Sequence, residues 1–172
     1  MRGSNRLVHT KREGAQMLSL SDYAAQDGLG LAELVAGKEV TPQELVDTAV
    51  LGIEKVNPRL NAVLQVLSEQ AKAEIEGGLP QGPFTGVPFL IKELVLHAKN
   101  TRLDMGSRLA QGYVASEDSE LMARFRRAGL VLVGTTQTPE LGYNPTTSAE
   151  DGLRNEVQWY QENIFEKIDL WS

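Results

Sequence analysis

The clearest hydrophobic pattern in the chain predicts a helix that begins near residue 42. Thr41-Pro42-Gln43-Glu44 is a typical helix start, because threonine caps the first turn, proline fits the first helical position and Glu44 completes a capping box. Apolar residues then recur at spacings of three and four up to Val56, which places them on one buried face. Asn57-Pro58 is expected to end this helix, since proline lacks the N–H that the next turn needs.

Two shorter helices are predicted on either side of this one. Asp22 or Asp27 caps the first, and Gly37 is expected to end it in the left-handed conformation that glycine adopts readily. The second runs from about residue 68 to residue 75 and breaks at Gly77-Gly78.

A further helix and a strand form one unit later in the chain. Ser116 or Asp118 caps the helix, and Gly129 closes it. The run Leu130–Gly134 is apolar throughout, which is typical of a strand buried on both faces. A helix, a glycine and a buried strand in this order are the unit from which parallel sheets are built.

Two more strands complete the predicted sheet. Residues 60–66 alternate between apolar and polar positions, and the run Phe89–Ile91 follows a Gly-Val-Pro turn. The pattern therefore predicts an α/β fold in which helices pack on a small sheet.

Lys92 stands at the end of the Phe89–Ile91 strand, where a charged residue is unusual. If the strand is buried, loss of water disfavours the ammonium form and leaves a neutral amine that can accept a proton, as a general base must. The alternative is a lysine at the edge of the protein that extends its amine into water. The strand pattern by itself leaves both interpretations open.

Composition excludes several classes of function. The 172 residues are 41% hydrophobic and 23% charged, which is ordinary for a globular protein, and the net charge of −6 argues against nucleic-acid binding. Without cysteine there is neither a disulfide framework nor a thiolate metal site, and His9 and His97 lack metal-ligand spacing, so we expect no metal and no cofactor. No apolar run is long enough to cross a membrane, and a cytoplasmic location is the default expectation. Residues 1–17 are expected to be a disordered or vector-derived leader.

Four groups of residues, taken together, resemble the amidase signature family of serine amide hydrolases, from about residue 20 to residue 147. They are, in chain order, Thr41-Pro42-Gln43-Glu44-Leu45 with Val56-Asn57-Pro58 and Leu60-Asn61-Ala62; Gly82-Pro83-Phe84-Thr85-Gly86-Val87-Pro88-Phe89-Leu90-Ile91-Lys92-Glu93; Gly106-Ser107; and Asp118–Gly129 with Leu130–Gly142.

The resemblance implies a fold, a reaction and one site residue. The chain is expected to be the N-terminal part of the amidase signature fold, over residues 18–155, with helices packed on a small mixed sheet. The implied reaction is hydrolysis of a carboxylic amide to an acid plus ammonia or an amine. In the family a neutral lysine takes a proton through a bridging serine from a nucleophilic serine, and backbone amides stabilise the oxyanion. Of these groups, only the lysine has a counterpart here, Lys92.

The chain departs from the family pattern in three places. The Gly-Gly-Ser-Ser-Gly-Gly-Ser type of stretch that supplies the two serines is absent, and the likeness stops after Asn155. Glu93 replaces the usual aspartate, so we expect its hydrogen bonds to shift within the surrounding loop. Gln137 stands where asparagine is usual. Without the serines, the chain is expected to be inactive or nearly so by itself.

Ser107 is the one alternative nucleophile that the sequence offers near Lys92. A Ser-Lys dyad would need the Ser107 hydroxyl to give its proton to the amine. The commoner role of a serine in such a loop is to cap a turn with its hydroxyl.

Residues 156–172 are expected to form an amphipathic helix or a tail. Val157, Tyr160, Ile164, Ile168 and Trp171 recur at helical spacing, with charged residues on the opposite face. This segment motivates the alternative hypothesis, a non-catalytic binding or regulatory module whose C-terminal helix contacts a partner. The expected partners are a small amide substrate and, through an exposed sheet edge or this helix, a second copy of the chain; nucleic acid and membrane are not expected.

Overall fold

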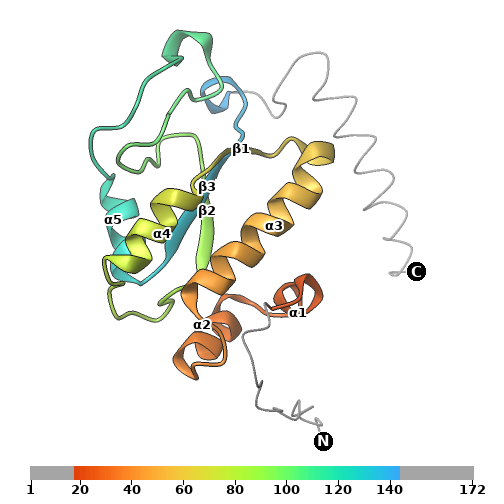
Figure 1. Ribbon diagram of the computed structural model, residues 1–172. Helices are drawn as coiled ribbons and strands as arrows, with labels where there is room; N and C mark the ends of the chain where they lie inside the picture. The colour runs from red at the N-terminus through yellow and green to blue at the C-terminus, as the bar shows by residue number, and fades with distance from the viewer. Residues whose placement is uncertain (1–17, 144–172) are drawn as a thin grey trace, which may run out of the picture. The chain divides into compact units, whose positions relative to one another are not determined.

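A computed structural model describes residues 18–143 of the chain. Its helices and strands are α1 Leu20–Ala24, α2 Gly28–Ala36, α3 Pro42–Leu60, β1 Val63–Val66, α4 Ser68–Glu76, β2 Pro88–Lys92, α5 Glu120–Arg127 and β3 Val131–Thr136, with short 3-10 turns at Arg108–Ala110 and Glu140–Gly142 (Figure 1). The predictions for residues 1–17 and 156–172 lie outside the described residues. Within the described range, no helix combines the length and the apolar character that crossing a membrane requires.

The three strands form one mixed sheet in the order β1-β3-β2. β1 pairs antiparallel with β3, and Gln65 lies opposite Thr135. β2 runs parallel to β3, since the Val131 N–H donates to the Val87 carbonyl at the start of the pair and the Glu93 N–H donates to the Thr136 carbonyl at its end. The predicted α/β class with a small mixed sheet is confirmed.

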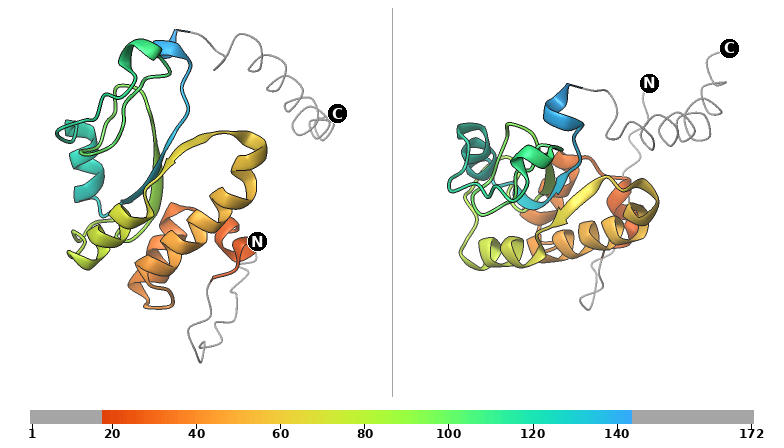
Figure 2. Two further views of the ribbon diagram at one scale, coloured as in Figure 1. Left: turned by 45° about the horizontal axis from the view of Figure 1, so that its top comes forward. Right: turned by 90° about the horizontal axis from the view of Figure 1, so that it is seen from above.

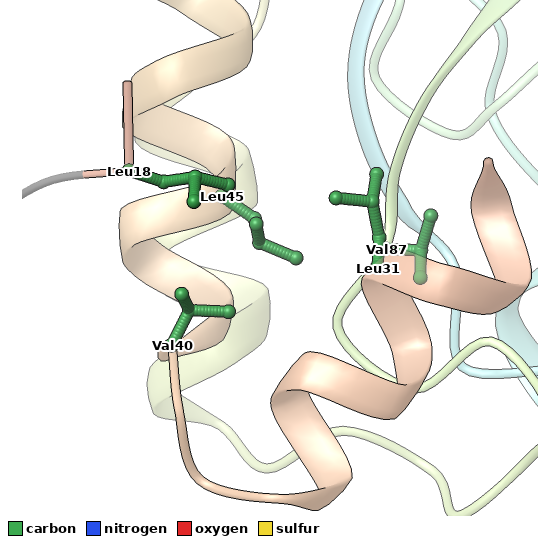
Figure 3. Packing of buried hydrophobic residues seen from close by; sticks show 5 residues of the cluster. All are labelled: Leu18, Leu31, Val40, Leu45 and Val87. Carbon is green, nitrogen blue, oxygen red and sulfur yellow. The ribbon is translucent and has the colours of Figure 1, made fainter. Parts of the chain in front are cut away.

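The described residues divide into two compact units, and the strands β2 and β3 and the helices α3 and α5 each contribute to both. The first unit contains residues 18–55, 67–89 and 126–133, and the second contains 56–66, 90–125 and 134–143. In the first unit, α1 and α2 lie beside the N-terminal half of α3 (Figure 2). Figure 3 shows the apolar cluster that holds them there, made of Leu18, Leu31, Val40, Leu45 and Val87.

The start of α3 confirms the predicted capping box. The Glu44 carboxylate accepts from the Thr41 N–H at 2.7 Å, and the Thr41 hydroxyl accepts from the Glu44 N–H at 3.2 Å. The predicted end is wrong, because the helix continues through Pro58 to Leu60. The Asn57 side chain joins the end of this helix to the segment after it: its amide oxygen accepts from the backbone N–H groups of residues 62 and 63, and its NH₂ donates to the carbonyl of Val63.

At two other helix ends the details of capping differ from the prediction. Asp27 caps α2 as expected, but Gly37 is right-handed at φ −72° and Lys38 takes the left-handed conformation at φ 57°. The cap of α5 is Ser119, whose hydroxyl accepts from the Met122 N–H. Asp118, one of the two predicted caps, instead accepts from the Lys99 N–H. In both cases the helix is predicted correctly and only its boundary moves.

The two outer strands are less buried than the central one. Five of the six residues of β3 are buried, as its apolar run predicts. In β2 the side chains of Pro88 and Ile91 are buried while Leu90 is 38% exposed. In β1 the apolar residues Leu64 and Val66 are 37% and 45% exposed. The sheet order explains this difference, since β1 and β2 are the edges of the sheet among the described residues.

Candidate active site

Lys92 is the last residue of β2, and its side chain is exposed. The preceding residue, Ile91, is buried, so the strand's alternation turns the lysine away from the core. A buried lysine amine is one of the two interpretations that the sequence left open, and Lys92 is not buried among the described residues. The observed position matches the alternative in which the amine reaches water.

Glu93 takes the buried position next to Lys92 and is 1% exposed. Its backbone N–H donates to the Thr136 carbonyl at 2.9 Å, which continues the β2–β3 pairing by one residue. Its Oε1 accepts from the Asp104 N–H at 2.8 Å. Its Oε2 is buried and has no hydrogen-bond partner among the described residues.

The loop that Glu93 contacts is held together from several sides. The Asp104 carboxylate accepts from the Gly112 N–H at 2.9 Å, and its second oxygen lies 3.9 Å from Arg102 Nε. The Met105 carbonyl accepts from the Leu141 N–H at 2.8 Å. Residues 104–112 are therefore tied both to the end of β2 and to the turn at 140–142.

Ser107 belongs to this loop and is 5% exposed. Its hydroxyl donates to Glu140 Oε1 at 2.8 Å and accepts from the Leu109 N–H at 3.2 Å, which caps the turn at 108–110. A hydroxyl has one proton to donate, and here that proton goes to Glu140. The geometry supports the structural role of Ser107 and gives no support to a Ser-Lys dyad.

Gly106 explains how the two loops approach so closely. It has φ 63°, and a Cβ at this position would lie 2.5 Å from the Thr138 carbonyl oxygen. Only glycine meets both conditions. The Gly106-Ser107 pair, noted in the sequence for its resemblance, thus serves to join the loop after β2 to the loop after β3.

Comparison with known proteins decides the family. The family model described as Amidase matches residues 44–152. The 6-aminohexanoate-cyclic-dimer hydrolase of Paenarthrobacter ureafaciens is 41% identical over 128 residues, which cover 73% of this chain and 25% of that protein. The chain belongs to the amidase family.

Solved structures of this family share the fold. A structure of 6-aminohexanoate cyclic dimer hydrolase superimposes with a TM-score of 0.67 at 38% identity, covering 73% of this chain and 26% of that one. A bacterial aryl acylamidase of the amidase signature family gives a TM-score of 0.64 at 27% identity, covering 71% and 27%. The chain thus spans about a quarter of the length of the curated amidases it matches.

What this amidase segment can do by itself is limited by its side chains. A lysine amine is present, but the 172 residues contain no Gly-Gly-Ser-Ser stretch from which a bridging and a nucleophilic serine could come. Among residues 18–143 no group of three histidine, aspartate or glutamate side chains is arranged to hold a metal ion. The described residues therefore place a lysine amine at the end of β2, beside a loop that is held to the turn at 140–142.

Sequence reasoning noted Glu93 as a departure from the family but missed its burial. The signal was available in the strand alternation, since Ile91 faces the core, Lys92 faces away, and Glu93 must face the core again. In this structure the Glu93 carboxylate accepts from the Asp104 N–H, and the expected change relative to an aspartate stays a prediction.

Proposed function

We propose that this chain is the lysine-bearing segment of an amide hydrolase, with Lys92 as the general base. The observation that carries the proposal is the position of Lys92 at the end of β2, inside the region that matches the amidase family. The reaction is hydrolysis of a carboxylic amide to an acid plus ammonia or an amine. The relatives differ in the substrates that their names give, among them a cyclic dimer and lipoamide, so they support the reaction class and leave the substrate open.

The role of Lys92 depends on residues that this chain does not contain. A hydroxyl becomes a good nucleophile when an adjacent base removes its proton, and the family takes that hydroxyl from its serine stretch. Lys92 is exposed, whereas exclusion of water favours the neutral amine that a base requires. We therefore infer that the chain has little or no hydrolytic activity until the serine-bearing part of an amidase covers Lys92.

A chimera tests the proposal directly. Residues 18–143 replace the aligned quarter of the Paenarthrobacter ureafaciens hydrolase, and hydrolysis of the 6-aminohexanoate cyclic dimer is measured. Loss of one catalytic proton transfer is expected to lower kcat by about 10²–10⁴-fold in Lys92→Ala. Lys99→Ala, which removes another exposed lysine of the same unit, is expected to keep activity.

Each outcome of this experiment bears on the proposal. A folded chimera that hydrolyses the dimer and loses activity with Lys92→Ala supports it. A folded chimera that is inactive, or one that stays active after Lys92→Ala, contradicts the role of Lys92. The 172-residue chain alone, assayed against aliphatic and aryl amides beside its Lys92→Ala variant, is expected to show no turnover that depends on Lys92.

A further inference from the structure

The segment immediately after Lys92 combines a buried carboxylate with a strained backbone. Glu93 is almost completely buried, and its Oε2 has no hydrogen-bond partner among the described residues. Buried carboxylates in proteins are normally paired with a cation or fully hydrogen-bonded, because removing the charge from water is costly. Among the described residues, the side chain of Glu93 accepts one hydrogen bond, from the Asp104 N–H to Oε1, and none at Oε2.

The backbone that follows makes two consecutive tight turns. Leu94 N–H donates to the Lys92 carbonyl at 2.8 Å, and Leu96 N–H donates to the Leu94 carbonyl at 2.6 Å. The centre of the second turn is Val95, at φ 62° with a side chain 76% exposed. A β-branched residue in this conformation is strained, and an exposed valine gains little from packing that would offset the strain. Residues 94–96 are therefore a strained part of the chain directly after Glu93.

We propose that Glu93 Oε2 is the acceptor for a positively charged side chain, an arginine or a lysine, from the remaining three-quarters of the amidase fold. This inference rests on the proposed function, since it concerns the part of the fold that would complete the same site. The length comparison supports it, because the curated relatives are about four times as long as the segment that they share with this chain.

This arrangement assigns Glu93 a docking role beside Lys92. One carboxylate oxygen holds the Asp104 loop, and the other ties the end of β2 to the incoming part of the fold. Because Lys92 and Glu93 are adjacent, the ion pair fixes the strand end from which the lysine amine extends. Glu93 is a positioning residue in this proposal and takes no part in proton transfer.

The Glu93→Gln variant distinguishes this docking role from a purely structural one. Its effect on the urea midpoint should be opposite in the chain alone and in the chimera. In the full 172-residue chain, glutamine keeps an oxygen for the Asp104 N–H and removes the buried charge, so the urea midpoint is expected to rise. In the chimera described above, the variant loses the ion pair, so the midpoint is expected to fall and kcat to drop by about tenfold or more. Glu140→Gln is the matched control: Glu140 is exposed and already accepts from Ser107, so we expect the same small effect in both contexts.

Every outcome decides for or against the docking role. Opposite shifts in the chain and the chimera support it. A fall in both contexts means that Glu93 serves only the local loop, and no fall in the chimera means that no cation binds there; either result overturns it. Failure of the chimera to fold, where the parent hydrolase folds, also counts against it, since this segment must accept the rest of the fold. The role of Lys92 fails separately, through an inactive folded chimera or an active Lys92→Ala variant.

Discussion

The Ser107 hydroxyl donates a hydrogen bond to the Glu140 carboxylate across an Oγ–Oε1 distance of 2.8 Å. This bond joins the loop after β2 to the turn after β3, at the point where Gly106 allows the two backbones to meet. The hydroxyl that looked like a possible nucleophile in the sequence is therefore a structural link. Its proton is committed to a carboxylate and not to the lysine that a Ser-Lys dyad would need.

Ser107→Ala is expected to destabilise the chain without affecting catalysis. Loss of the bond to Glu140 and of the cap at Leu109 should lower the free energy of unfolding by about 1–2 kcal/mol. Urea unfolding of the chain measures the first effect, and hydrolysis by the chimera measures the second. Ser116→Ala, at an exposed serine, is the control and should change neither. A Ser107→Ala chimera that loses activity while it remains folded would contradict the structural role.

Alanine substitutions at Gly78 and Gly129 distinguish the cost of backbone strain from the cost of a steric clash. Both have positive φ, 89° and 91°, but a Cβ on Gly129 would lie 2.5 Å from Thr85 Cα, while a Cβ on Gly78 meets nothing within 4 Å. Gly78→Ala is expected to cost about 1 kcal/mol from conformation alone. Gly129→Ala should cost at least about 2 kcal/mol more, since the backbone of Thr85 must move. Equal midpoints for the two variants in urea would show that the α5–β3 connection is looser than this contact implies.

Val95 should be replaceable with a gain in stability. Its φ of 62° is unfavourable for a β-branched side chain, whereas asparagine tolerates this region well. Val95→Asn is expected to raise the free energy of unfolding by about 1 kcal/mol. Val114→Asn is the matched control, because Val114 is similarly exposed but pairs with Arg102 in an extended bridge. There asparagine should be neutral or destabilising, and a gain at both sites would point to a general effect of removing exposed valine.

The positions of the helices and strands were predicted well from the sequence, whereas the contacts and exposure of the residues at their ends were predicted poorly. Capping at Thr41 and the apolar run of β3 depend on nearby residues, and both were predicted correctly. The helix α3 extends past Pro58, and the Asn57 side chain bonds to residues beyond its end; spacing rules describe neither feature. The strand alternation places Ile91 in the core and Lys92 outside it, but the run Phe89–Ile91 is apolar throughout and does not by itself show which face is buried. The strand end that carries Lys92 was thus predicted from the sequence, while the exposure of its side chain was left open.

Tyr23 provides a pH dependence that can be tested on the chain alone. Burial against the apolar cluster raises the pKa of Tyr23 above the ordinary value of 10.0, because the phenolate is harder to desolvate than the phenol. The folded state then holds its proton more tightly than the unfolded state, so this contribution to stability is complete below pH 10. It is lost as the pH rises through the folded-state pKa. Unfolding midpoints measured from pH 8 upward should fall less steeply for Tyr23→Phe than for the parent chain, whereas Tyr113→Phe, at an exposed tyrosine, should leave the slope unchanged.

The exposed apolar residues of β1 predict self-association of the chain. Leu64 and Val66 are 37% and 45% exposed on a strand that is an edge of the described sheet, where unpaired backbone groups favour pairing with another copy. Sedimentation should therefore show mass increasing with protein concentration, and the urea midpoint should rise with it. Leu64→Lys places a charge on that edge and should shift the chain toward monomer, while Leu121→Lys, the same change at an exposed position of α5, should have little effect. A monomer at every concentration, with one concentration-independent transition, would show that the edge of β1 is protected in solution.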